Sequence, residues 1–308
     1  MHNYIRKDHG FIAAISEYNP ASVVMVGAPL DITVTFRPGT RDGPTAIRVM
    51  SQSLEDYSLE LGRELNSVPV YDAGDLVLPA GDLAASLGRI EDAVDAVMGD
   101  GKLPLLLGGE HLLTLPAVKA AARRYPDLIV VQFDAHADLL DSYEGATLSH
   151  ATVMRRVAEI VGEENVVQLG IRSATRDEVA FARDNTLMYC YDVIPALDEI
   201  LQAIKGRPVY VTVDIDVVDP AFAPGVGTPE PGGIDAREFI QAAYYLYDMN
   251  VIGMDLVEVN PAFDRANLTA LLAAKFLREA ILCLGRAGRA KIKVVDSRLA
   301  GRKNVNRS

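Results

Sequence analysis

The chain has 308 residues, of which 49% are hydrophobic and 23% charged, with a net charge of −12. This length and composition exclude a disordered chain and predict a globular protein with a large core. The negative charge disfavours nucleic acid and anionic membranes as partners, and no apolar run approaches the roughly 18 residues of a membrane span. Cys190 and Cys283 lie far apart and form no CxxC pair, so we expect reduced core thiols and a cytoplasmic location.

Short apolar runs rich in β-branched residues recur along the chain and alternate with helical patterns. They predict strands at 22–27, 68–74, 103–109, 128–135, 165–171, 187–192, 208–216 and 251–259, and the helical spacing is clearest at 82–98 and 266–284. Because the strand runs are apolar on both faces, they favour an α/β fold with a mostly parallel sheet between two helical layers. No linker-like segment divides the sequence, so we expect a single three-layer α/β/α domain over 1–308, with 1–20 and 296–308 peripheral or frayed.

Three of these predicted strands end in acidic and histidine residues. The residues are His111 after the third strand, Asp134, His136 and Asp138 after the fourth, and Asp214 and Asp216 at the end of the seventh. Functional residues of such sheets gather beyond the carboxyl ends of the strands. Alternate residues of an extended chain point to one side, so each acidic run would converge on one point if it stays extended.

Each motif also has a structural explanation when it is taken alone. A DxD at a strand end is often structural, the DAHAD run could be an ion-paired network, and His111 could be a core histidine. The acidic cluster contains no Lys or Arg, however, and three of the five histidines lie in or beside these motifs. Six such ligands suit two divalent ions that share carboxylates. Oxygen and imidazole donors without a thiolate favour Mn²⁺, and Zn²⁺, Fe²⁺, Co²⁺ and Ni²⁺ stay open.

The sequence resembles the arginase/agmatinase family of binuclear manganese ureohydrolases over roughly residues 20–285. The matching motifs are GGEH (108–111), FDAHADLLDSYEGATLSHATVMRR (133–156), VDIDVVDPAFAPGVGTPEPGG (213–233) and GMDLVEVNPAFD (253–264), with FRPGTRDGPTAIR (36–48) before them. The resemblance implies two Mn²⁺ ions. One would be held by His111, Asp134, Asp138 and Asp214, and the other by Asp134, His136, Asp214 and Asp216.

The resemblance also implies a mechanism, in which a metal-bridging hydroxide attacks a guanidinium carbon and releases urea and an amine. Glu258 matches the carboxylate that holds the guanidinium, a role that suits its bidentate geometry. His150 matches a mobile histidine that carries protons to the leaving amine. Two residues depart from the family pattern: Glu110 stands where many members have Asp, and Ala151 where agmatinases usually have Gly.

The predicted substrate is a small cationic guanidino compound, agmatine, which would give putrescine and urea. Arginases place polar side chains after the DAHxD motif, whereas Leu139 and Leu140 stand here, and GIRS (170–173) lacks the acidic residue that follows the Arg in arginases. Neither leucine can bind the charged head of arginine.

The tail of the substrate leaves more than one possibility open. Asp141, Tyr143 and Glu144 are candidates to contact the distal amine of agmatine, although a solvated loop face is the default. Arg37 and Arg41 could instead bind a carboxylate, which keeps guanidinobutyrate and guanidinopropionate open. Guanidine, formiminoglutamate and, less favoured, arginine also stay open as substrates.

Two other classes of protein compete with a guanidinium hydrolase. A deacetylase-like amidohydrolase would use one zinc and fewer carboxylates, and a non-catalytic relative would have lost a ligand or the catalytic acid. In this chain all six ligand positions and the position of the catalytic acid are filled. The family resemblance further implies a homo-oligomer, a trimer or a hexamer.

Overall fold

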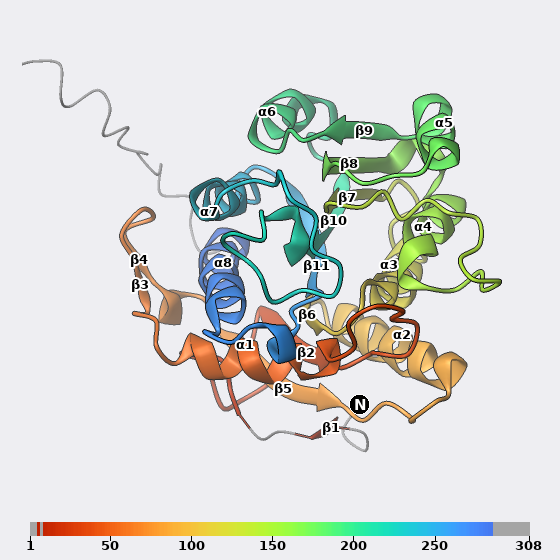
Figure 1. Cartoon of the computed structure of the whole chain (residues 1–308). Helices are drawn as coiled ribbons and strands as arrows, with labels where there is room; N and C mark the ends of the chain where they lie inside the picture. The colour runs from red at the N-terminus through yellow and green to blue at the C-terminus, as the bar shows by residue number, and fades with distance from the viewer. Residues whose placement is uncertain (1–4, 7–8, 286–308) are drawn as a thin grey trace, which may run out of the picture.

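The computed structural model describes residues 5–6 and 9–285. A nine-stranded sheet forms the centre of this part of the chain (Figure 1). The strand order is β1-β5-β2-β6-β11-β10-β7-β8-β9, and every neighbouring pair is parallel except β1 and β5. The strands are β1 (Ile5–Arg6), β2 (Val23–Ala28), β5 (Val70–Leu76), β6 (Leu103–Gly108), β7 (Ile129–Phe133), β8 (Val166–Ile171), β9 (Leu187–Cys190), β10 (Pro208–Asp214) and β11 (Asn250–Val257). A separate two-stranded ribbon pairs β3 (Tyr57–Ser58) with β4 (Arg63–Glu64).

Helices cover both faces of the sheet, so the predicted α/β/α arrangement with a mostly parallel sheet is confirmed. One core cluster joins the sheet to α1 (Gly43–Ser51), α6 (Ile194–Ala203), α7 (Ala236–Tyr245) and α8 (Leu268–Leu284). The other joins it to α2 (Leu83–Gly99), α3 (Thr114–Ala122), α4 (Val153–Val161) and α5 (Arg176–Asn185) (Figure 1). Every residue of β2, β7, β8 and β10 is buried, as expected for strands covered on both faces.

The cysteines differ from each other in their surroundings. Cys283 is buried in α8, but Cys190 is exposed. Cys190 ends β9, which lies at the edge of the sheet and buries none of its four residues. The prediction of a core thiol is therefore wrong for Cys190, because little of the chain covers a strand at the edge of the sheet.

The N-terminal segment lies partly against the sheet. The strand β1 pairs with β5 at the sheet edge, and Phe11, in a segment expected to be peripheral, is 3% exposed. The tail 296–308 lies outside the described residues. Among the described helices, none is long and apolar enough to cross a membrane.

A buried ion pair ties α1 to β5. Arg48 is 2% exposed, and its Nε and Nη2 donate to the two oxygens of Asp72 at 2.9 and 3.0 Å. Its Nη1 also donates to Asp75. Removing one member of a buried pair leaves the other charge without its counter-ion, which is far more costly than losing a surface pair.

We expect Arg48→Met to lower the free energy of unfolding by about 3–5 kcal/mol in urea titrations, because Asp72 stays buried without the guanidinium. The matched control is Arg123→Met, which removes a half-exposed arginine paired with Glu91 and Asp95 and should cost less than about 1 kcal/mol. Equal losses for the two variants would contradict this account of the pair.

Candidate metal centre and active-site cavity

The candidate residues lie at the carboxyl ends of four adjacent strands, β6, β11, β10 and β7. His111 follows β6, Glu258 follows β11, Asp214 ends β10 and Asp134 follows β7. These segments are far apart in the sequence, and it is the strand order of the sheet that makes them neighbours. The arrangement places the site where parallel α/β sheets generally carry their ligands.

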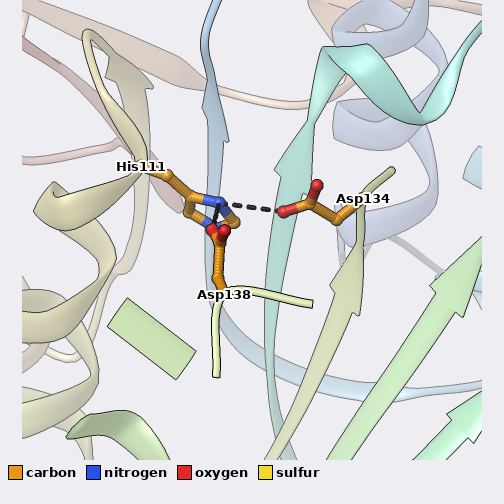
Figure 2. A group of neighbouring side chains, drawn as sticks. All are labelled: His111, Asp134 and Asp138. Carbon is orange, nitrogen blue, oxygen red and sulfur yellow. Dashed lines mark ion pairs between the residues drawn. The ribbon is translucent and has the colours of Figure 1, made fainter. Parts of the chain in front are cut away.

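Two groups of side chains have the spacing of metal ligands. His111, Asp134 and Asp138 form the first, and all three are buried. Nδ1 of His111 lies 3.0 Å from Asp134, 3.2 Å from Asp138 and 3.6 Å from Asp214. In Figure 2 the imidazole points between the carboxylates of Asp134 and Asp138.

The second group shares Asp134 with the first and adds His136 and Asp216. Nδ1 of His136 lies 2.9 Å from Asp216 and 3.6 Å from Asp134. In each group the ligand atoms lie within 4.8 Å of one another. A carboxylate common to both groups is the arrangement that a two-metal site requires.

The chain does not stay extended through these motifs, which corrects the geometry assumed from the sequence. β7 ends at Phe133, and Asp138 has a φ of +55°, in the left-handed region that residues other than Gly rarely adopt. Asp216 lies in the 3₁₀ turn Ile215–Val217, and its N–H donates to Asp214 at 2.8 Å. The side chains meet because the backbone bends after each strand.

His111 is oriented by a buried polar network on the side away from the carboxylates. Its Nε2 lies 2.9 Å from Oγ1 of Thr212, which donates its hydrogen to Asp255 at 2.6 Å. Thr212 can therefore only accept from His111, so Nε2 carries the ring proton and Nδ1 presents a lone pair. This Nδ1 is buried and makes no well-directed hydrogen bond among the described residues, although three carboxylates surround it. A lone pair that faces carboxylates fits a cation between them.

The crowding of the acids also shifts their pKa values. Burial and the charge of Asp134 raise the pKa of Asp138 to about 7, and burial together with Asp216 raises the pKa of Asp214 well above its usual value. Burial alone would lower the pKa of His136, but Asp216 and Asp134 outweigh it and raise that pKa to about 12. Burial alone would lower the pKa of His111, but Asp134 and Asp138 outweigh it and raise that pKa well above its usual value. Because Nδ1 makes no well-directed hydrogen bond to these carboxylates, a cation shared with them fits the site better than a proton on Nδ1. Divalent cations would relieve this excess of negative charge.

A cavity of about 310 Å³ opens onto these residues. Besides His111, His136, Asp138 and Asp214, it is lined by Ala137, Leu140, Tyr143, His150, Ala151, Ser173, Ala174, Thr175, Glu178, Thr228 and Glu258. Four of the lining residues are acidic, and none of the described ones is Lys or Arg. The cavity therefore suits a cationic ligand.

Glu258 and His150 both face this cavity. Glu258 is 6% exposed, has a φ of +67° and accepts the N–H of His111 at 2.9 Å, and burial raises its pKa to about 8. Burial lowers the pKa of His150, and the ring of Tyr143 lies edge-on to it at 5.6 Å. Six described residues other than Gly have left-handed backbone, and two of them, Asp138 and Glu258, lie at this site, where such strained conformations often gather.

Of the three candidates for contact with the substrate tail, the structure brings only Tyr143 to the cavity. The side chain of Asp141 is 78% exposed and pairs with Arg156 at 2.8 Å. Glu144 is exposed at the tip of a tight turn, with a φ of +49°. Asp141 and Glu144 lie on the same loop as Tyr143 but are not among the residues that line the cavity.

The two arginines considered for binding a carboxylate are also engaged elsewhere. Arg41 pairs with Asp31 at 2.9 Å, and the guanidinium of Arg37 lies 4.9 Å from the ring centroid of Phe263. Neither arginine lines the cavity.

Sequence reasoning did not identify Glu178, a buried carboxylate in the cavity lining. Its two oxygens accept the N–H groups of Leu139 at 2.9 Å and Thr175 at 2.7 Å. A signal was available, because the spacing of Thr175 and Glu178 is that of a capping box, which begins α5 at this point.

Known proteins of similar sequence and fold point to one family. The model of the arginase family matches residues 21–283. Agmatinase from Bacillus anthracis is 47% identical over 88% of this chain and 95% of its own length, and guanidinobutyrase from Pseudomonas aeruginosa is 35% identical over 87% and 88%. The crystal structure of agmatine ureohydrolase from Thermoplasma volcanium has a TM-score of 0.82 at 35% identity, covering 91% of this chain and 95% of that one. The chain therefore belongs to the arginase family and is an agmatinase-like ureohydrolase.

Proposed function

We propose that this protein hydrolyses agmatine to putrescine and urea at a pair of manganese ions. The observation that carries the proposal is a cavity whose lining holds Glu178 and Glu258 and no described Lys or Arg, next to two His/Asp groups that share Asp134. The 47% identity to an agmatinase supports the same substrate.

The proposed ligands are His111, Asp134, His136, Asp138, Asp214 and Asp216. Four carboxylates and two imidazoles without a thiolate favour manganese among the divalent ions. A bound pair of such ions lowers the pKa of water and supplies a hydroxide nucleophile near neutral pH.

Glu258 is proposed to hold the guanidinium. One of its oxygens is engaged by the N–H of His111, which fixes the carboxylate, and each carboxylate oxygen can accept a further donor. A guanidinium presents a planar fork of N–H donors that pairs well with a carboxylate. It would also compensate a carboxylate whose pKa is raised by burial.

His150 is proposed to deliver a proton to the departing amine. The side chain lines the cavity, and an imidazole whose pKa is lowered by burial can exchange protons near neutral pH. Without that proton the leaving group would depart as an amide anion, which is a very poor leaving group.

For the distal ammonium of agmatine, we propose Glu178 and Tyr143 as the polar groups of the cavity wall. Glu178 is buried there and its oxygens keep acceptor capacity beyond the two backbone bonds. Leu140 lines the same cavity and suits the tetramethylene chain of agmatine better than the charged head of arginine. A carboxylate at the end of the substrate would meet acidic side chains and no lining cation.

A cytoplasmic location and assembly into a trimer or hexamer are also proposed. The first is supported by the spacing of the cysteines and the second by the family resemblance.

The substrate is tested by urea release from the manganese-loaded chain with agmatine, arginine, 4-guanidinobutyrate and guanidine. We expect kcat/KM for agmatine to exceed that for arginine and guanidinobutyrate by roughly 100-fold or more, because the carboxylate of these two compounds would meet Glu178 and no cation among the described lining residues. Arginine or guanidinobutyrate hydrolysed as efficiently as agmatine would overturn the choice of substrate.

The role of Glu258 is tested by Glu258→Gln, which keeps the shape but removes the charge. We expect kcat/KM for agmatine to fall by about 100-fold or more, or ~2.7 kcal/mol, while the manganese content stays unchanged. Glu164→Gln, at an exposed position before β8, is the matched control. Unchanged kinetics for Glu258→Gln would rule out this role.

The metal assignment is tested by counting ions after manganese saturation and desalting. The full chain should retain about two ions, and His136→Ala about one, because His136 belongs to only one of the two groups and alanine has no atom that can bind a metal. His9→Ala, at an exposed histidine outside both groups, should retain both ions. Two ions in His136→Ala would show that the ligands are assigned wrongly.

A further inference from the structure

The segment 32–33 is fastened to the metal-binding edge of the sheet by one buried carboxylate. Glu110 is 0% exposed and lies directly before His111. Its Oε1 accepts the N–H of Ile32 at 2.7 Å and that of Thr33 at 3.0 Å. Its Oε2 accepts the N–H of Thr33 at 3.1 Å and also the hydroxyl hydrogen of Thr33. Among the described residues, all hydrogen bonds of this carboxylate therefore go to residues 32 and 33.

The hydroxyl of Thr33 connects this carboxylate to His150. Oγ1 accepts the backbone N–H of His150 at 3.1 Å and lies 3.4 Å from its Nδ1. A carboxylate has no hydrogen to donate, so the hydroxyl hydrogen goes to Glu110 and Oγ1 can only accept from the imidazole. The hydrogen of a neutral His150 ring therefore lies on Nδ1, and Nε2 keeps its lone pair.

Two further contacts hold His150. The backbone is fixed by the capping box of Ser149, whose N–H donates to Oγ1 of Thr152 at 2.9 Å. The ring of Tyr143 lies edge-on to the ring of His150. The hydroxyl of Tyr143 in turn lies 3.2 Å from Oγ1 of Thr35, two residues after Thr33. Thr33 is thus the polar contact that selects the ring nitrogen, and Tyr143 restricts where the ring can lie.

We propose that Thr33, held by Glu110, is a positioning residue that sets the orientation and tautomer of His150. The inference rests on the proposed function, in which His150 delivers a proton to the leaving amine. When Nδ1 of the ring donates to Thr33, Nε2 is the atom that takes up a proton and passes it on. Thr33 therefore determines which ring nitrogen of His150 is available for proton transfer. The role is not a direct contact with substrate, so its loss should reduce turnover rather than substrate binding.

The first test compares Thr33→Val, which removes the hydroxyl at nearly constant volume, with Thr33→Ser, which keeps it. We expect Thr33→Val to lower kcat for agmatine by about 10–100-fold with little change in KM, and Thr33→Ser to recover most of the loss. Manganese content should match the unmodified chain in both. Thr33→Ala, which removes the hydroxyl without adding a methyl group, should show the same loss if Thr33→Val is poorly folded.

The matched control is Thr40→Val. Thr40 is 0% exposed at the start of the 3₁₀ turn Thr40–Asp42, and its hydroxyl has no hydrogen-bond partner among the described residues. This variant should keep its kcat, which separates loss of the Thr33 contact from loss of any buried threonine hydroxyl.

The second test repeats Thr33→Val in a His150→Asn background. If Thr33 acts through His150, the double variant should be no slower than His150→Asn alone. The same fold-loss in both backgrounds would overturn the inference, and so would a Thr33→Val enzyme with full kcat. A His150→Asn enzyme with full kcat would instead overturn the proposed role of His150, and the inference would fall with it.

Discussion

Four buried aspartates meet at one edge of the central sheet, and the two imidazoles beside them are the only side chains there, among the described residues, that can carry a positive charge. Asp134, Asp138, Asp214 and Asp216 come from two segments, and burying like charges together is costly unless cations compensate them. The sheet makes this possible, because the order β6-β11-β10-β7 brings four strand ends together and the core clusters on both faces fix the strands. The proposed activity depends on this concentration of negative charge.

The same site shows how the fold holds residues in uncommon conformations. Asp138 and Glu258 both have left-handed backbone, which costs of order 1–3 kcal/mol each for residues other than Gly. Behind them, hydroxyl groups select the nitrogen that each histidine presents: Thr212 accepts from Nε2 of His111, and Thr33 faces Nδ1 of His150. The two histidines are therefore oriented by different segments, His111 by a residue of β10 and His150 by a residue of the segment that precedes α1.

Much of the fold follows from the sequence, because fully apolar, β-branched runs separated by helical spacing are typical of a covered parallel sheet. All eight predicted strands are present, and the helix predicted at 82–98 is α2. The exposure of Cys190 could not be predicted, because its apolar strand gives no sign of lying at the sheet edge. The contacts of Glu110 and the bond from Leu139 to Glu178 depend on distant segments, so the sequence alone does not reveal them. The pairing of Asp141 with Arg156 and the exposed turn at Glu144 likewise become visible only in the folded chain.

The central claim is that two cations occupy the space between the two His/Asp groups. Anomalous diffraction at the manganese absorption edge, from crystals of the manganese-saturated full chain, tests it most directly. The account predicts two peaks roughly 3.5–4 Å apart, one beside His111 and Asp138 and the other beside His136 and Asp216, with Asp134 between them. A single peak, or peaks away from these side chains, would contradict it.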